Sequence, residues 1–121
     1  MKIETSGPRG SQGKTYIKMK IETSGPRGSL SQQMVKFDIV TRRHVEWTQE
    51  NCFPSEPVFV ASPGAVEEDD GVILSSVISA DPKVSPFLLV LDAKTWEEMG
   101  RASIPVQVHM DLHGLFIPAA V

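Results

Sequence analysis

The chain has 121 residues and a formal charge of -3, so it has room for one small domain. Proteins that bind nucleic-acid backbones present a basic face, and the mild acidity therefore argues against a nucleic-acid partner. A single cysteine, Cys52, excludes an internal disulfide. No apolar run reaches the roughly 18 residues that a membrane-spanning helix requires, and no secretory signal is recognised, so we expect a cytosolic location.

The N-terminal part contains an identical repeat. The sequence MKIETSGPRGS occupies residues 1–11 and again residues 19–29. Two copies are too few for a solenoid, and the glycine- and proline-containing SGPRGS stretch is typical of turns or flexible chain. Alternation over residues 15–23 would suit a strand. We nevertheless predict that the duplicated segment 1–29 is poorly ordered and stands apart from a domain formed by residues 30–121.

The first strong strand signal lies in VKFDIV and HVEWTQ, residues 35–40 and 44–49. Val35, Phe37 and Ile39 fall on one face of the first stretch, and the second stretch alternates in the same way. This period of two, across a short connection, predicts a β-hairpin.

Three further apolar runs predict strands: PVFVA at 57–61, GVILSSVIS at 71–79 and FLLVLDA at 87–93. The stretch AKTWEEM at 93–99 is short for a helix and is more typical of a turn between antiparallel strands. Residues 99–118 predict more strand. Many short strands with turn signals predict an all-β antiparallel meander of the kind found in sandwiches, barrels and propellers. About 90 such residues would make roughly two propeller blades.

The segment with the most suggestive chemistry is VHMDLHGLF, residues 108–116. Apolar and polar residues alternate over eight positions from Val106 to His113, which is the period of a strand, so the histidine pair is not a helical zinc motif. We interpret His109 as part of a solvated polar face. We expect His113, which precedes Gly114 and an apolar tail, to be partly buried, with a partner for each ring nitrogen. The spacing alone leaves a ligand role as the minority interpretation.

Two other motifs have plain interpretations when taken alone. EEDDG, residues 67–71, lacks the alternating oxygen ligands of a calcium loop and is interpreted as a charged turn before a strand. In CFPSEP, residues 52–57, Glu56 is interpreted as a lone exposed carboxylate. Cys52 has no neighbouring base in sequence that would activate a catalytic thiol.

Taken together, four segments resemble the C-terminal end of the carotenoid cleavage oxygenases, a family that includes the retinal-pigment-epithelium isomerohydrolase. These segments are PSEPVFV, EEDDGVILS, PFLLVLDAKTWEEMGRAS and HMDLHGLFIP, in this order. The resemblance covers residues 30–118. The form HMDLHGLF is most similar to the animal members that cleave β-carotene at its central double bond.

The resemblance implies a seven-bladed β-propeller with Fe(II) on its axis, held by four histidines, some of which are oriented by glutamates. It implies that His113 is the last of these ligands and that Glu56 is its hydrogen-bonded partner. A carboxylate on one ring nitrogen fixes the tautomer and leaves the other nitrogen for the metal. The implied reaction is oxidative cleavage of a carotenoid by dioxygen to give apocarotenal or retinal. The family's peripheral membrane contact would admit the apolar substrate.

This chain has three histidines, His44, His109 and His113, and only the last matches a family ligand. We therefore expect the chain to be the C-terminal portion, or a truncated product, of such an oxygenase. The missing propeller blades would be its partners, and the chain alone would lack activity. Two alternatives stay open: a non-catalytic module that adds a strand to another chain's sheet, and an inert fragment whose exposed sheet edges prevent a stable fold.

Overall fold

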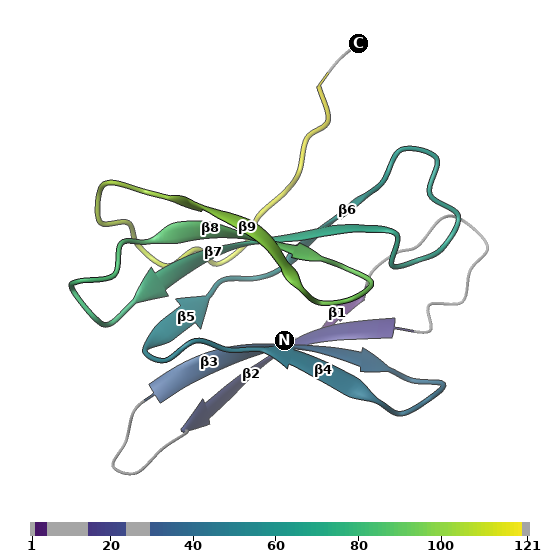
Figure 1. Cartoon of the computed structure of the whole chain (residues 1–121), viewed down its shortest axis with the longest axis horizontal. Coiled ribbons are helices and arrows are strands. Elements are labelled where there is room, and N and C mark those ends of the chain that lie inside the picture. The colour runs from purple at the N-terminus through teal and green to yellow at the C-terminus, as the bar shows by residue number, and fades with distance from the viewer. Residues whose placement is uncertain (1, 5–14, 24–29, 120–121) are drawn as a thin grey trace.

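The computed structural model describes residues 2–4, 15–23 and 30–119, and every regular element in this part of the chain is a β-strand. The strands are β1 Lys2–Glu4, β2 Thr15–Thr23, β3 Leu30–Asp38, β4 His44–Trp47, β5 Cys52–Pro54, β6 Val58–Ala61, β7 Gly71–Ser79, β8 Phe87–Asp92 and β9 Glu98–Ser103. They form two antiparallel sheets stacked as layers (Figure 1). This confirms the predicted all-β antiparallel meander, as expected for an incomplete part of a propeller.

The first sheet has the order β1-β2-β3-β4, and the second has the order β5-β7-β8-β9 with β6 also paired to β7. The strand suggested by alternation over residues 15–23 is β2. Residues 1, 5–14 and 24–29 lie outside the described residues, so the predicted poor order of the segment 1–29 stays a prediction.

The predicted hairpin is confirmed as β3 and β4, with Phe37 opposite His44. At its turn, the Asp38 Oδ1 atom accepts hydrogen bonds from the backbone N–H groups of Thr41 at 3.1 Å and Val40 at 2.8 Å. These two donors lower the pKa of the Asp38 carboxyl group. The apolar face noted in the sequence is the less buried one, since Phe37 and Ile39 are 36% and 39% exposed.

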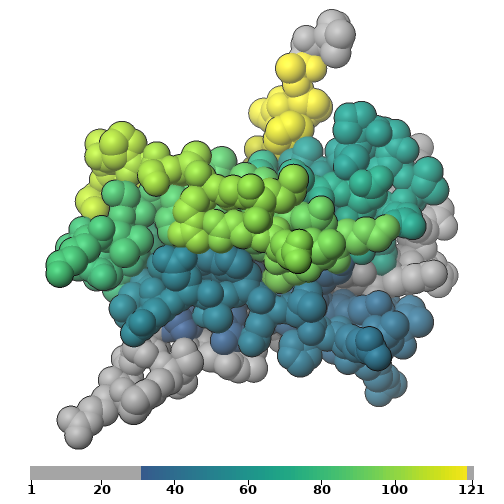
Figure 2. Space-filling model, in the orientation of Figure 1, coloured from purple at the N-terminus to yellow at the C-terminus, as the bar shows by residue number. Residues whose placement is uncertain are grey.

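The opposite face of the β3–β4 hairpin meets the second sheet, and the core lies between the two layers. The core residues are Met34, Trp47, Cys52, Ile73, Val77, Phe87, Leu89, Leu91, Ala93 and Trp96. The rings of Trp47 and Phe87 meet edge to face at 6.5 Å across the interface. In Figure 2 the blue layer of β3 and β4 lies directly against the green layer of the second sheet. Desolvation raises the pKa of the buried Cys52 thiol, which agrees with a structural role for this side chain.

A turn between β8 and β9 is confirmed, but it covers residues 93–97, since Glu98 and Met99 of the predicted turn already belong to β9. The Asp92 Oδ1 atom accepts hydrogen bonds from the N–H groups of Thr95 and Lys94, which lower the pKa of this carboxyl group. Trp96 adopts a left-handed conformation with φ of 64°, which is unfavourable for a bulky residue. Its ring is nevertheless buried in the core.

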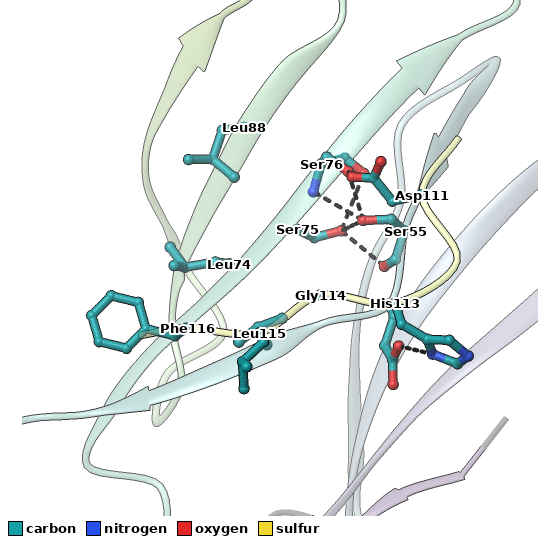
Figure 3. Close-up of a pocket in the computed structure, with 12 residues that line it drawn as sticks. Ser55, Leu74, Ser75, Ser76, Leu88, Asp111, His113, Gly114, Leu115 and Phe116 are labelled. Carbon is teal, nitrogen blue, oxygen red and sulfur yellow. Dashed lines mark hydrogen bonds and ion pairs between the residues drawn. The ribbon is translucent and has the colours of Figure 1, made fainter. Parts of the chain in front are cut away.

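The strand prediction for residues 99–118 is only partly right. β9 ends at Ser103, and the C-terminal tail, defined here as residues 104–119, contains no strand. Ile104 donates the last backbone bond of this region, to Pro86, and Pro105 has no N–H to continue the ladder. The apolar side chains of the alternating stretch stay exposed; Leu112, for example, is 81% exposed. The tail instead crosses the second sheet and brings His113 and Phe116 to a pocket that is also lined by Ser55, Glu56 and residues of β6, β7 and β8 (Figure 3).

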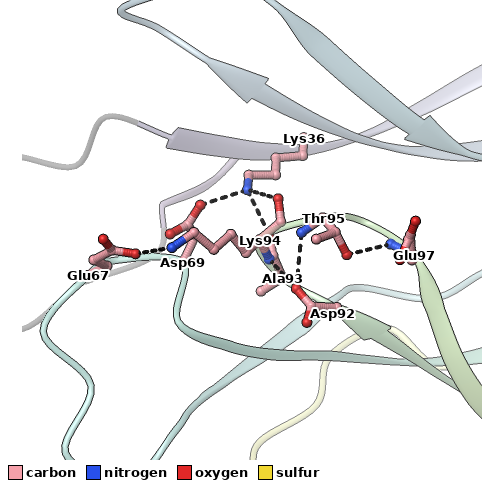
Figure 4. A network of polar contacts seen from close by, with 8 residues as sticks. All are labelled: Lys36, Glu67, Asp69, Asp92, Ala93, Lys94, Thr95 and Glu97. Atoms are coloured by element: carbon pink, nitrogen blue, oxygen red, sulfur yellow. Dashed lines mark hydrogen bonds and ion pairs between the residues drawn. The ribbon is translucent and has the colours of Figure 1, made fainter.

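A buried lysine joins the two sheets. Lys36 on β3 is 8% exposed, and its Nζ atom donates to Asp69 Oδ2 at 2.9 Å, Ala93 O at 2.7 Å and Lys94 O at 3.1 Å (Figure 4). An ammonium group has three donors, so the group is fully satisfied. Because a buried charge is costly unless it is paired and hydrogen-bonded, these acceptors must stay in place when the sheets pack.

The EEDDG motif supplies one of these acceptors. Asp69 pairs with Lys36, and Glu67 pairs with Lys94 at the surface. Gly71 ends the motif where β7 passes close to β6: a Cβ atom there would lie 2.2 Å from Val60 O. These contacts agree with the structural interpretation of the motif as a charged turn that leads into a strand.

Replacing Lys36 with alanine should destabilise the chain by about 2–4 kcal/mol, because it leaves the partly buried Asp69 carboxylate without its partner. The free energy of unfolding is measured by urea denaturation. Lys94→Ala is the matched control, and this exposed pair should contribute little. Equal effects of the two substitutions would contradict a special role for the buried ammonium.

Gly71→Ala should destabilise the chain by about 1–3 kcal/mol, because the new methyl group overlaps the β6 backbone. Gly100→Ala is the control, since no atom lies within 4 Å of a Cβ atom built there. Both variants are compared by thermal unfolding. Equal stability of the two variants would show that the close approach of β6 and β7 is not required.

Candidate metal-ligand site

The site begins at a break in the edge of the second sheet. β5 and β6 both pair with β7, with Pro54 opposite Val77 and Val58 opposite Leu74. Residues 55–57 of the edge therefore face only residues 75–76 of β7, so that one residue is extra. Such a bulge bends the strand and redirects a side chain. It falls on the PSEP motif, where Pro57 has no N–H to give to a regular ladder.

Three serines stabilise the bulge through one backbone hydrogen bond and several hydrogen bonds of their hydroxyl groups. Ser55 N donates to Ser76 O at 2.8 Å, and Ser76 N donates to the Ser55 hydroxyl oxygen at 3.0 Å. The hydroxyl groups of these two residues lie 2.8 Å apart, and Ser75 Oγ donates to Ser55 O at 2.9 Å. Ser55 and Ser75 are nearly inaccessible to solvent. The bulge is therefore fixed by buried polar contacts.

The bulge presents Glu56 to the C-terminal tail. Glu56 Oε2 lies 2.5 Å from His113 Nδ1, and the two side chains are 19% and 75% exposed. The expectation that His113 is partly buried was wrong, because the tail lies on the surface instead of within a sheet. The partner nearer the interior is Glu56, so its interpretation as a lone exposed carboxylate was also wrong. Within the described residues, no hydrogen bond reaches His113 Nε2.

An open pocket of about 190 Å³ lies between the tail and the sheet. Its polar side holds Glu56, His113 and the serines, whereas its apolar side is formed by Val58, Leu74, Leu88, Leu115 and Phe116. Figure 3 shows Leu74, Leu88 and Phe116 at the end of the pocket away from His113. The arrangement places one imidazole beside an apolar surface.

The described residues fit one ligand position of a metal centre and not a whole centre. With Nδ1 engaged by a carboxylate, His113 Nε2 is the nitrogen available to a metal. His44 lines a different pocket, beside Arg43, and His109 is exposed. No group of three or more histidine, cysteine, aspartate or glutamate side chains that could hold a metal ion is found among the described residues.

Sequence reasoning missed two residues at this site, Asp111 and Ser76. Ser76 Oγ donates to Asp111 Oδ2 at 2.5 Å, which attaches the tail two residues before His113. The available signal was the position of Asp111 on the same face as His113 in the alternating stretch. Its partner could not be found from the sequence, because the two residues are 35 positions apart.

Comparison with known proteins places the chain in a family. Residues 12–118 match the family described as retinal pigment epithelial membrane protein, so the chain belongs to the carotenoid cleavage oxygenase family, as the sequence motifs predicted. The match includes residues 12–29 as well as the part in which the resemblance was recognised.

Individual relatives agree with this family. The chain is 57% identical over 84 residues to rat β,β-carotene 15,15'-dioxygenase, with 69% of this chain and 15% of the relative aligned. It is 57% identical over 81 residues to the human protein of that name, and 53% identical over 81 residues to human mitochondrial carotenoid-cleaving dioxygenase. These alignments cover 67% of this chain and 15% and 14% of the relatives. The chain thus spans about one seventh of their length.

Glu56 should fix the tautomer of His113. In the unmodified chain the neutral ring should carry its proton on Nδ1, because Nδ1–H can then donate a hydrogen bond to the Glu56 carboxylate, and Glu56→Ala should shift the proton toward Nε2. Long-range ¹⁵N–¹H NMR correlations of the imidazoles measure this shift. His109 serves as the internal control in the same spectra. The same tautomer of His113 in both proteins would contradict the assigned role of Glu56.

Proposed function

We propose that the chain is the C-terminal part of an Fe(II)-dependent dioxygenase that cleaves a polyene double bond of a carotenoid to give apocarotenal or retinal. The observation that carries the proposal is the contact of 2.5 Å between Glu56 Oε2 and His113 Nδ1, in a chain of this family. Oxygenase names of the relatives support the reaction class. The chain alone is proposed to be inactive, since it offers a single imidazole at the site.

Each residue has a defined part in this proposal. Glu56 accepts a hydrogen bond from Nδ1–H and holds the ring plane, and Nε2 would be the atom that binds the metal. When bound, Fe(II) supplies dioxygen activation for cleavage of the double bond, and imidazole is a ligand that suits iron. The apolar side of the pocket would contact the hydrocarbon chain of the substrate and exclude water beside it.

The remaining imidazole ligands would come from the propeller blades that this chain does not contain. A cytosolic location with peripheral membrane contact belongs to the same proposal. In the described residues no helix has the length and apolar character needed to cross a membrane. One relative is named as mitochondrial, so the compartment requires its own measurement by cell fractionation.

His113→Ala in the native protein that carries this sequence should lower bound Fe(II) at least ~10-fold and remove carotenoid cleavage, because one iron ligand is lost. The protein is captured through the segment 108–116, its intact mass is recorded, and iron and aldehyde products are quantified. His109→Ala is the control and should retain both properties. Unchanged iron content in His113→Ala would overturn the ligand assignment. A captured mass equal to this chain alone, with activity, would overturn the requirement for further blades.

A further inference from the structure

The position of His113 depends on very few contacts. In the described part of the chain, three hydrogen bonds join the C-terminal tail to the sheets: Ile104 N to Pro86 O at 2.7 Å, Ser76 Oγ to Asp111 Oδ2 at 2.5 Å, and the contact of His113 with Glu56 at 2.5 Å. The first lies at the start of the tail. The two side-chain bonds are therefore the polar contacts that hold the segment around His113 against the sheet.

The two side-chain bonds join residues that are close together both in the tail and at the bulge. Asp111 and His113 are two positions apart, with a bend at Leu112 between them, and each side chain bonds to a residue of the bulge or of β7 opposite it. Glu56 follows Ser55 directly, and the Ser55 hydroxyl lies 2.8 Å from that of Ser76. The tail is thus attached at two adjacent points on the bulge, called here the two-point attachment.

The hydroxyl groups form a chain with one consistent direction. The Ser76 hydroxyl group donates a hydrogen bond to the Asp111 carboxylate, so its oxygen can accept a hydrogen bond from the Ser55 hydroxyl group. The Ser55 Oγ atom in turn accepts a hydrogen bond from Ser76 N–H at 3.0 Å. A hydrogen bond to an ionised acceptor is shorter and stronger than a neutral one, and linked hydrogen bonds polarise one another. Asp111 is therefore attached to the buried part of the bulge.

The bond from Glu56 does not fix His113 by itself. The His113 side chain is 75% exposed, so packing does little to restrict its rotamer, and a tail held at one point could pivot about that bond. A metal ligand has to be held to within roughly half an ångström of its productive position. The second point, two residues away, removes this rotation.

We infer that Asp111, held by Ser76, is a positioning residue that sets the direction of His113 Nε2. The bond between Asp111 and Ser76 is independent of any metal. The effect of Asp111 on iron binding rests on the proposed function. The two parts are therefore tested separately.

The first test uses the full 121-residue chain and the imidazole NMR signals of His113. Asp111→Ala and Ser76→Ala should each average the His113 tautomers, and the double variant should add little to Ser76→Ala, because both changes remove the same Ser76–Asp111 bond. Ser76→Ala also removes the contact between the Ser55 and Ser76 hydroxyl groups. Asp111→Asn should restore the single tautomer, since its amide oxygen can accept from Ser76. Amide shifts of β7 and β8 verify the fold. An unchanged His113 signal in Asp111→Ala with an intact fold would overturn the inference.

The second test measures Fe(II) affinity of the native protein that carries this sequence. Asp111→Ala should weaken it ~10- to 100-fold and Asp111→Asn by less than about threefold, the loss expected for an outer support of a ligand. His109→Ala is the tail control. If His113→Ala retains iron, the proposed function fails whatever Asp111 does. If His113→Ala loses iron and Asp111→Ala keeps full affinity, only the positioning inference is overturned.

Discussion

The buried ammonium group of Lys36 is the interaction on which the two-layer arrangement depends. It lies on the face of β3 that meets the second sheet, and its three acceptors come from the loop before β7 and the turn after β8. Hydrophobic contacts between the layers are not directional, but an ammonium group with three fixed acceptors is satisfied in one relative position of the sheets. The EEDDG motif gains its physical meaning here, because Asp69 is the one charged acceptor.

A second constraint follows along β7. Gly71 allows β6 to approach closely, and the pairing of β6 and β5 with the same strand leaves one extra residue at Ser55–Pro57. The polar side chains of the pocket lie at or beside this bulge. In a regular edge strand, the direction of the Glu56 side chain would follow the alternation between the two faces of the sheet. The bulge changes this direction, and Glu56 contacts the tail. The serine contacts stabilise this irregular backbone, since each of its polar groups named above has a hydrogen-bond partner.

Family membership and the site geometry support each other while resting on different observations. The family follows from the match over residues 12–118, and the contact of Glu56 with His113 follows from the coordinates. The chain covers about 15% of the length of a relative such as the rat enzyme, so the iron centre proposed above would take its other ligands from parts of the protein outside this chain. In the proposed function, the chain would contribute one ligand, His113, its carboxylate partner Glu56 and an apolar wall of the pocket.

The sequence by itself determined β6, β7, β8 and the β3–β4 hairpin, because period-two alternation and turn residues are local properties. β5 was not predicted, and the strand predicted over residues 99–118 ends at Ser103. Motif order also determined the family and singled out His113 and Glu56. Only the tertiary structure decided which face of β3 is buried, since burial depends on the partner sheet and not on the alternation itself. It also decided that the alternating tail stays outside a sheet, because an alternating segment forms a strand only where a neighbouring strand pairs with its backbone. The attachment of Asp111 to Ser76 joins residues distant in sequence, and folding alone brings them together.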